Sequence, residues 1–369
     1  MKAAVLQENF SKALSQASHF VNPHAQLPVL GNILLEANKT KLYVLSTNLE
    51  MSLSTSIGAK VEKEGKVAVP AKTIVELVSH LSKGTVDLVQ NKEQLAISQE
   101  GFLGNVAGMN TNDFPSIPQS FEKGDILTLP KDDLIKSLSK VAFAVSQDET
   151  RPVLTGVLFL LSPDSLTLVA SDGFRLSQKK IPAKLKGEGK VVIPKPALME
   201  LVKIASSSDS LSFQIKSGAN QVVFGIGESD AFLATRIIEG EFPNFEKIIP
   251  KVSNTKVKVG REDLVRAVKI ASVFAKDQGN IVKLTTGEGS LTVSAESSSV
   301  GNQKTKLDAN VVGPSVEISF NWKFIEEVAN AVEGEEIEIA LVDTSSPGVF
   351  RDSKDPDFLH LIMPVKVTS

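Results

Sequence analysis

Three basic residues occupy the same place in three amphipathic segments of this 369-residue chain. Lys12, Lys136 and Arg266 each follow the leading apolar residue of their segment by two positions, on the side away from the apolar face. Cations repeated at one position suit a surface that faces a polyanion, because a surface that serves only solubility has no reason to repeat one sign at one place. The pattern therefore predicts a polyanionic partner. For any one segment taken alone, a plain solvated basic face is the alternative.

Patterns that could support catalysis are weak. Residues 187–190 (GEGK) lack the Ser or Thr and the following helix of a phosphate-binding loop, and residues 225–227 are a lone G-x-G. Asp352, Asp355 and Asp357 lack the Gly and Glu spacing of an EF-hand loop, which favours a solvated acidic turn. The absence of Cys and the four scattered His argue against disulfides, thiolate catalysis and a zinc site. We predict no catalytic residue, no metal and no cofactor, although a Ser, His and acid set assembled from distant segments stays open.

The net charge and the hydropathy of the chain limit which compartment and which partners can be expected. The formal net charge of −3 argues on average against nucleic acid, but an average can hide a basic face. There is no apolar run of about 18 residues and no basic, apolar leader at the start of the chain. We therefore expect a cytoplasmic protein without membrane contact.

The three cations lie on segments with the 3.6-residue period of an amphipathic helix. Acidic residues near the starts of the second and third segments favour the positive end of a helix. A further amphipathic helix is expected in each repeat, within residues 67–81, 191–205 and 318–332, and the second of these carries Lys195 and Lys203 on its polar side. The apolar faces of the three leading helices consist of Phe10, Leu14, Ala17 and Val21, of Leu134, Leu138, Val141 and Val145, and of Leu264, Val268 and Ala271.

These helices are set in a threefold repeat. Residues 151–182 have the alternation and turn chemistry of a β-meander. The same layout recurs 124 residues earlier, over residues 27–56, and in a more divergent form over residues 279–307. We expect an α+β chain of three tandem domains, each with two helices on one side of antiparallel sheets. The predicted boundaries are 1–120, 121–250 and 251–369.

Three motifs in register within this repeat give the chain a family resemblance. They are SDGFRL at 171–176, EGEFPNFEKIIP at 239–250 and LIMPVKV at 361–367. With them, essentially the whole chain resembles the bacterial sliding clamps, the β subunits of DNA polymerase III. The resemblance implies the DNA-clamp fold and two chains closed head to tail into a ring, with the helices facing the encircled DNA.

The resemblance also implies a function and partners. The protein is expected to be a non-catalytic processivity factor of the polymerase holoenzyme. Its implied partners are a second copy of itself, double-stranded DNA without sequence preference, the replicative polymerase, the clamp loader and other proteins with a clamp-binding motif. A repeat scaffold that binds proteins but never DNA is the alternative reading. The implied DNA-facing residues are Lys12, His24, Lys136, Lys140, Arg151, Lys195, Lys203 and Arg266.

A hydrophobic cleft between the second and third domains is implied as the site for short peptides in which a Gln is followed by Leu and Phe. Phe174, Phe324 and Lys247 stand where the family frequently has His, Tyr and Arg, which predicts an altered peptide preference. The alternative for Leu154, Leu176, Ile248 and Leu361 is ordinary core. The implied cleft residues are Leu154, Ser171, Gly173, Phe174, Arg175, Leu176, Pro243, Lys247, Ile248, Asn321, Phe324, Ser345, Leu361, Met363, Pro364, Val365 and Lys366.

Ring closure requires exposed sheet edges on the first and third domains. Edges are expected near residues 102–106 and 293–299. The predicted interface residues are Leu103, Val106, Val273 and Phe274.

Overall fold

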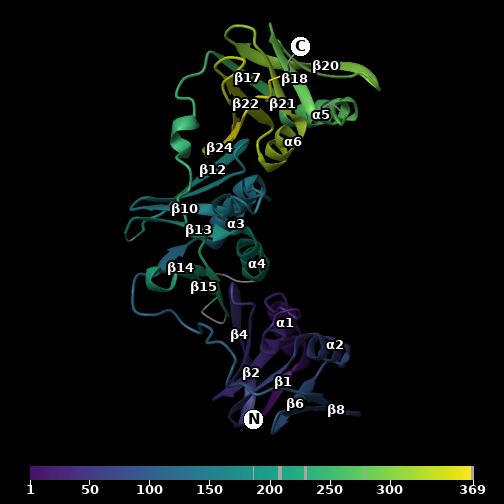
Figure 1. The fold of residues 1–369 in the computed structure, drawn as a ribbon, viewed down its shortest axis with the longest axis vertical. Coiled ribbons are helices and arrows are strands. Elements are labelled where there is room, and N and C mark those ends of the chain that lie inside the picture. The colour runs from purple at the N-terminus through teal and green to yellow at the C-terminus, as the bar shows by residue number, and fades with distance from the viewer. Residues whose placement is uncertain (186, 207–209, 228–230, 278, 367–369) are drawn as a thin grey trace. The chain divides into compact units, whose positions relative to one another are not determined.

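The structure, a computed structural model, describes most of the chain, namely residues 1–185, 187–206, 210–227, 231–277 and 279–366 (Figure 1). The described residues form two compact units. Unit 1 contains Met1–Lys131 and Pro196–Ile237, and unit 2 contains Asp132–Lys195 and Ile238–Ser369. The division between the units passes through the middle repeat, so the two units do not coincide with the three predicted domains.

Six α-helices occur in the described residues, two in each repeat, as predicted. The residues predicted to form the apolar faces of the leading helices are buried, except that Val21 is only partly so, and Phe10, Leu134 and Leu264 are fully buried. Val21 and Val145 lie beyond the ends of their helices. Because these faces pack on the sheets, the opposite faces are left to solvent. The helices are α1 (Gln7–Ser18), α2 (Ala71–His80), α3 (Lys131–Val141), α4 (Lys195–Ala205), α5 (Arg261–Ala275) and α6 (Trp322–Ala331).

Unit 1 holds an antiparallel sheet in which Met51–Thr55 pairs with Ala231–Thr235 and so joins the first repeat to the second. The helices α1 and α2 lie beside each other and pack on its apolar face (Figure 1). Its strands are β1 (Lys2–Leu6), β2 (Asn32–Asn38), β3 (Lys41–Thr47), β4 (Met51–Lys63), β5 (Gly65–Pro70), β6 (Thr85–Asn91), β7 (Gln94–Gln99), β8 (Phe102–Ala107), β9 (Leu127–Leu129), β14 (Leu211–Lys216), β15 (Gln221–Ile226) and β16 (Ala231–Arg236).

Unit 2 holds a second antiparallel sheet, in which Arg175–Lys179 pairs with Phe358–Ile362 and so joins the second repeat to the third. The helices α5 and α6 pack side by side on the core of the third repeat (Figure 1). Its strands are β10 (Gly156–Ser162), β11 (Ser165–Ser171), β12 (Arg175–Pro182), β13 (Gly189–Pro194), β17 (Thr255–Gly260), β18 (Ile281–Gly287), β19 (Ser290–Ser297), β20 (Gly301–Val312), β21 (Glu317–Asn321), β22 (Glu336–Leu341), β23 (Gly348–Asp352) and β24 (Asp355–Ile362).

The predicted meander is present in every repeat, as β2–β3–β4, β10–β11–β12 and β18–β19–β20. One boundary differs from the prediction. The second meander, predicted over residues 151–182, begins only at Gly156, because Pro152–Leu154 forms a 3₁₀ turn. Pro28–Gly31 forms the corresponding turn of the first repeat. In both, the fixed φ of proline suits the first position of such a turn.

Candidate nucleic-acid interface and partner site

The three repeated cations lie exposed on their helices. Lys12, Lys136 and Arg266 are on the solvent faces of α1, α3 and α5. Two positions along a helix rotate a side chain by about 200°, so burial of each leading apolar residue directs the cation outward. Arg266 is restrained by an ion pair with Asp263, one turn earlier on α5. The predicted geometry is therefore present at all three positions, while contact with DNA stays a prediction.

The cations of α4 have different surroundings. Lys203 is exposed and lies 2.7 Å from Glu200 Oε1, and the other oxygen of Glu200 lies 2.7 Å from His19 Nδ1. Lys195 is half-buried, and its pKa is lowered by burial and by the positive charge of Arg175. Lys203 can meet a polyanion directly, whereas Lys195 is partly withdrawn from solvent.

The two loop residues predicted to contact DNA are both exposed. His24 lies in the loop before the first 3₁₀ turn, where its backbone N–H donates to Asn22. Arg151 Nε donates to Asp148 Oδ2 at 2.9 Å. Hydrogen bonds from Thr150 and Arg151 lower the pKa of Asp148, so the ion pair holds at neutral pH.

Lys140 corrects the prediction, because it does not face solvent. Only 5% of the residue is exposed, and its Nζ lies 2.8 Å from Asp355, 3.4 Å from Glu333 and 3.6 Å from Asp352. Lys140 follows Lys136 by four residues, but its side chain turns toward the acidic turns of the third repeat. Its charge is neutralised inside the protein and is not available to DNA phosphates.

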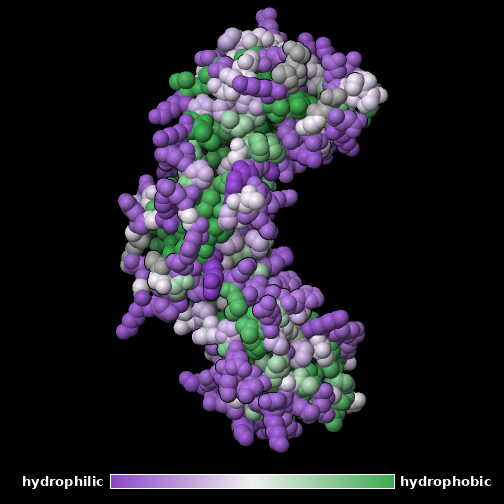
Figure 2. All heavy atoms as spheres, viewed as in Figure 1, coloured by the Kyte–Doolittle hydropathy of each residue, from purple (hydrophilic) through white to green (hydrophobic). Residues whose placement is uncertain are grey.

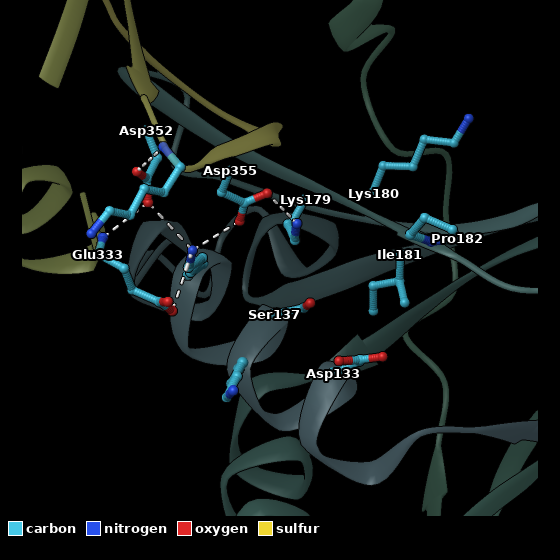
Figure 3. A pocket seen from close by; sticks show the side chains of 12 residues that line it. Asp133, Ser137, Lys179, Lys180, Ile181, Pro182, Glu333, Asp352 and Asp355 are labelled. Atoms are coloured by element: carbon cyan, nitrogen blue, oxygen red, sulfur yellow. Dashed lines mark hydrogen bonds and ion pairs between the residues drawn. The ribbon is translucent and has the colours of Figure 1, made fainter. Parts of the chain in front are cut away.

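A hollow of about 270 Å³ opens beside this cluster. Figure 3 shows the carboxylates of Glu333, Asp352 and Asp355 gathered around one ammonium group, with Lys179 bonded to Asp355. Burial would raise the pKa of Asp355, but the hydrogen bonds from Lys140 and Lys179 outweigh it, and the pKa is lowered. Burial likewise opposes the charge of Lys140, yet the neighbouring carboxylates raise its pKa.

The predicted cleft residues lie around an apolar cluster of unit 2. Leu154, Leu176 and Leu361 are buried in it, as the core alternative predicted, whereas Ile248 is 43% exposed. Phe174 is 60% exposed, and Figure 2 shows hydrophobic atoms at the surface over β10, β12 and β24. We call the surface formed by Phe174, Ile248 and the predicted cleft residues around them the apolar patch. Its further predicted members are partly buried at Asn321, Phe324, Met363, Pro364 and Val365 and exposed at Gly173, Pro243, Lys247, Ser345 and Lys366.

The turn that presents Phe174 is held by its own side chains. Ser171 Oγ donates to Arg175 O and accepts from Gly173 N, and Asp172 Oδ1 accepts from the N–H groups of Phe174 and Arg175. The carbonyl of Phe174 accepts from Met363 N at 2.8 Å, so the C-terminal segment is bonded to the same turn. The exposed ring of Phe174 therefore stands on a rigid support.

Arg175 lies beneath the apolar patch instead of on it. The residue is 7% exposed, pairs with Asp172 at 3.0 Å and with Glu327 of α6, and donates to the carbonyl of Phe143 at 2.9 Å. Its guanidinium also packs on the ring of Phe324. Three of its five side-chain N–H groups are thus bonded within the chain, so this buried arginine positions the residues around it.

The predicted sheet edges are partly corrected. β8 is the terminal strand of its sheet path and Leu103 is 73% exposed, but Val106 is only 4% exposed. Residues three apart on a strand face opposite sides, so these two cannot share one surface. β19 is an interior strand bonded to β18 and β20, whereas residues 301–308 of β20 pair only with β19 among the described strands. Residues 301–308 of β20 therefore form an open edge of the third repeat, in addition to the terminal strand β21, whose Ser319 carbonyl accepts from Val365 N.

The two interface residues predicted on the third leading helix differ from each other in exposure. Val273 is 57% exposed on α5, whereas Phe274 is half-buried against the core of the third repeat. Ile270, one turn before Phe274, is 44% exposed and extends the apolar surface.

Comparison with known proteins covers nearly the whole chain. Sequence profiles of the N-terminal, central and C-terminal domains of the DNA polymerase III beta subunit match residues 1–118, 128–244 and 246–366, in that order. The chain belongs to this family. A beta sliding clamp of Staphylococcus epidermidis is 29% identical over 378 residues, which cover 99% of each protein.

Solved structures agree with the fold. The DNA polymerase III beta subunit of Thermotoga maritima is 26% identical with a TM-score of 0.91, and a DNA polymerase sliding clamp of Bacillus subtilis is 25% identical with a TM-score of 0.94. In both cases all of each chain is covered. The expected three-domain clamp fold is confirmed for this beta-subunit family member.

The motifs that could have supported catalysis have structural roles. The GEGK segment ends in β13 and belongs to the connection from β12. The carboxylates of Asp352 and Asp355 are engaged with Lys140, and no group of metal-binding side chains occurs among the described residues. Likewise, none of the described helices is both long enough and apolar enough to cross a membrane.

Sequence reasoning missed the acidic partners of the buried cations. Glu327, Asp352 and Asp355 bind Arg175 and Lys140 across the joint between the second and third repeats. Asp352 and Asp355 were noted only as a solvated acidic turn. Asp352 is the last residue of β23 and Asp355 is the first residue of β24, the strand that pairs with β12 of the second repeat. A signal in the sequence is their position at the turn of a predicted hairpin.

Proposed function

We propose that this protein is a DNA sliding clamp, in which two chains close head to tail around duplex DNA and tether the replicative polymerase. The ring would be built from domains 1–120, 121–250 and 251–369 of each chain in the cytoplasm. The protein is a processivity factor and not an enzyme, as its family membership indicates. The scaffold alternative is not supported, since the relatives that cover the whole chain are clamps.

The observation that carries the proposal is the repeated cation. Lys12, Lys136 and Arg266 lie exposed at one position of equivalent helices in three repeats. In a ring lined by these helices they would recur around the DNA. His24, Arg151, Lys195 and Lys203 are proposed to add to this lining, and Lys140 is excluded by its burial.

Movement of a ring along DNA requires that the contacts between protein and DNA be weak. A ring retains DNA by topology, so tight ion pairs are unnecessary and would oppose movement. Each neutralised phosphate steepens the salt dependence of log K by about 0.9, so many fixed contacts would hold the protein in place. Long side chains at spaced positions instead give a diffuse attraction, screened within about 8–10 Å, that centres the duplex without reading its sequence.

The apolar patch is proposed as the site for partner peptides. Exposed apolar surface of this kind usually marks a binding site, and the flexible Met363 side chain can adapt to related ligands. The peptide would lie across the exposed side chains of Phe174 and Ile248 and across Met363, which packs on the cluster that contains the buried leucines. The polymerase, the clamp loader and other partners would use the same patch in turn.

Closure of the ring is proposed to pair β8 of one chain with β20 of the other. Each strand offers unpaired backbone groups at a sheet edge, and antiparallel addition would satisfy both. Leu103 on β8 and Val273 on α5 supply exposed apolar contacts. This head-to-tail arrangement forms a ring if the rotation closes.

The test is retention on DNA after charge reversal. The chain carrying Lys12→Glu, Lys136→Glu and Arg266→Glu is loaded with its clamp loader onto nicked circular plasmid and separated from free protein by gel filtration. We expect the loaded fraction to fall about tenfold, since three attractive contacts per chain become repulsive. Linearisation of the plasmid should release the wild-type protein from DNA.

The matched control reverses three exposed lysines outside the helices, Lys60, Lys184 and Lys258, one from each repeat. This variant has the same net charge as the first and should load like the wild type. Equal loading of both variants would contradict the proposed lining. Retention of the wild type on linear DNA would contradict encirclement itself.

A further inference from the structure

The ion cluster around Lys140 joins two repeats. Lys140 on α3 and Lys179 on β12 belong to the second repeat. Their carboxylate partners Glu333, Asp352 and Asp355 all belong to the third. Every ion pair of the cluster therefore crosses the joint at which β12 pairs with β24. We call these five residues the joint cluster.

The cluster is buried and its geometry is restricted. The side chains of Lys140 and Asp352 are 6% and 0% exposed, and those of Lys179 and Asp355 are each 15% exposed. Asp355 bonds Lys140 with one oxygen and Lys179 with the other. Asp352 also accepts from the N–H groups of Glu333, Gly334 and Lys354. Two buried cations thus face two buried carboxylates, with the more exposed Glu333 at the rim.

The backbone packs closely around the joint cluster, so its side chains have little freedom to move. A Cβ at Gly334 would lie 2.7 Å from Asp352 Oδ1, so only glycine allows the turn to approach the carboxylate. Lys140 Nζ also lies 5.6 Å from the ring centroid of Phe358, opposite Lys179 in the β12–β24 pairing. The turn, the strand and the helix therefore meet at one ammonium group.

The joint in unit 1 is built differently. There the paired segments Met51–Thr55 and Ala231–Thr235 contain no charged residue. The contact of His19 with Glu200 also connects these two repeats, but the His19 side chain is 47% exposed. Apolar and small polar contacts tolerate small displacements, whereas buried charges are costly unless each keeps its partner at bonding distance. A buried ion cluster therefore adds little net stability but favours one orientation of the parts that it connects.

The neighbouring hollow does not suggest a ligand site. The carboxylates of Asp352 and Asp355 line it and are already paired with Lys140 and Lys179. The other charged residues of its lining outside the cluster, Asp133, Lys136, Lys180 and Lys354, are exposed and carry both signs. The joint cluster therefore has a structural role within the protein.

We infer that Lys140 is a positioning residue that fixes the orientation of the third repeat on the second, and thereby places the β20 edge for ring closure. This inference rests on the proposed ring only for its functional consequence. The orientation itself is a property of one chain and is measurable without DNA, loader or partner. Lys140, although on a helix that carries a DNA-facing cation, acts through Asp355 and not on DNA.

The test uses the absence of cysteine in the chain. Glu149→Cys in the second repeat and Lys276→Cys in the third are exposed sites for two spin labels. Labelled chain is diluted with unlabelled chain, so that pulsed electron paramagnetic resonance reports the distance within one molecule. We expect Lys140→Met to broaden the distance distribution about twofold, because three carboxylates lose their shared cation. Lys136→Met, on the exposed face of α3, is the matched control and should leave the distribution unchanged.

A second variant covers the case in which Lys140→Met does not fold. Lys140→Met combined with Asp355→Asn removes one charge of each sign and keeps a hydrogen-bond acceptor for Lys179. It should fold and still show the broad distribution. A narrow, wild-type distribution in either folded variant would overturn the inference.

Two functional measurements separate positioning from other roles. We expect Lys140→Met to raise the dimer dissociation constant about tenfold, which corresponds to 1.4 kcal/mol. It should leave the salt slope of DNA binding unchanged, whereas Lys136→Met should reduce that slope. A reduced slope in Lys140→Met would assign the residue to DNA and overturn the inference. A wild-type chain that forms no dimer would instead contradict the proposed function, while the distance measurement would still decide the positioning role.

Discussion

The guanidinium carbon of Arg175 lies 4.4 Å from the ring centroid of Phe324, and the two residues come from different repeats. The same guanidinium pairs with Asp172 in the turn that presents Phe174 and with Glu327 on α6. Arg175 therefore ties the exposed aromatic ring of the apolar patch to the third repeat. Stacking and ion pairing use the planar shape of arginine, which lysine lacks.

Substitution Arg175→Lys should weaken the apolar patch while keeping the charge. A lysine cannot stack on Phe324 and reach both carboxylates, so we expect the free energy of unfolding to fall by about 2 kcal/mol. The affinity for a labelled peptide with Gln followed by Leu and Phe should fall about fivefold. Unfolding in urea is followed by the single tryptophan, Trp322, and binding by fluorescence anisotropy.

Arg236→Lys is the control for this change, because Arg236 is an exposed arginine in the same repeat. It should leave both quantities unchanged. If Arg175→Lys also binds the peptide like the wild type, Arg175 does not support the patch.

Gly173→Ala tests the turn beneath Phe174. Gly173 has φ +92°, and a Cβ there would lie 2.9 Å from Arg151 Nη1. Gly187 has nearly the same φ, +91°, with open space around it, and so provides a matched control. We expect both alanine variants to lose about 1 kcal/mol of stability from the backbone conformation. Only Gly173→Ala should reduce peptide affinity, by about threefold, as measured by anisotropy. Equal affinities of the two variants would mean that the turn does not position Phe174.

The fold was predictable because its signals are local and repeated. Helix faces such as Phe10 and Leu134 follow from a 3.6-residue period, and the meander follows from alternation and turn residues. Repetition at a spacing of 124 residues then assigned the same elements to the first two repeats, and a more divergent copy assigned them to the third. Exposure of Lys12, Lys136 and Arg266 followed from burial on the opposite helix face.

The wrong predictions concern residues whose exposure is decided by tertiary contacts. Lys140 lies near Lys136 in sequence, but carboxylates more than 190 residues later in the chain turn it inward. Val106 was grouped with Leu103 by proximity, although an odd spacing on a strand separates them. The open edge at β20 depends on which strands pair, and the pattern of one strand does not contain that information.

The proposed ring predicts a stable dimer. Light scattering across a dilution series should give a molar mass near twice 39.5 kDa. Leu103→Asp places a charge on the exposed β8 edge and should raise the dissociation constant about 100-fold without unfolding the chain. Val252→Asp, at a residue 71% exposed outside the proposed interface, is the control. A monomer at every concentration of the wild type would contradict spontaneous ring closure.

His360 predicts a pH dependence of stability. The side chain is fully buried on β24, shares a hydrogen bond with Ser177 and has no partner for Nε2 among the described residues. Burial and the charge of Arg175 lower its pKa to about 3 from an ordinary value of 6.5. Below pH 6.5 His360 therefore binds a proton in the unfolded chain but stays neutral in the folded chain. Stability should fall with decreasing pH over this window, with a slope of about 1.4 kcal/mol per pH unit from this residue.

The variant His360→Gln removes this titration while keeping hydrogen-bonding capacity toward Ser177. Urea unfolding at pH 6.5 and pH 5.0 should show that the wild type loses about 2 kcal/mol more than the variant between these values. His80→Gln, at an exposed histidine on α2, should behave like the wild type. Parallel losses in the wild type and His360→Gln would show that His360 accepts a proton without unfolding, which requires that water reach Nε2.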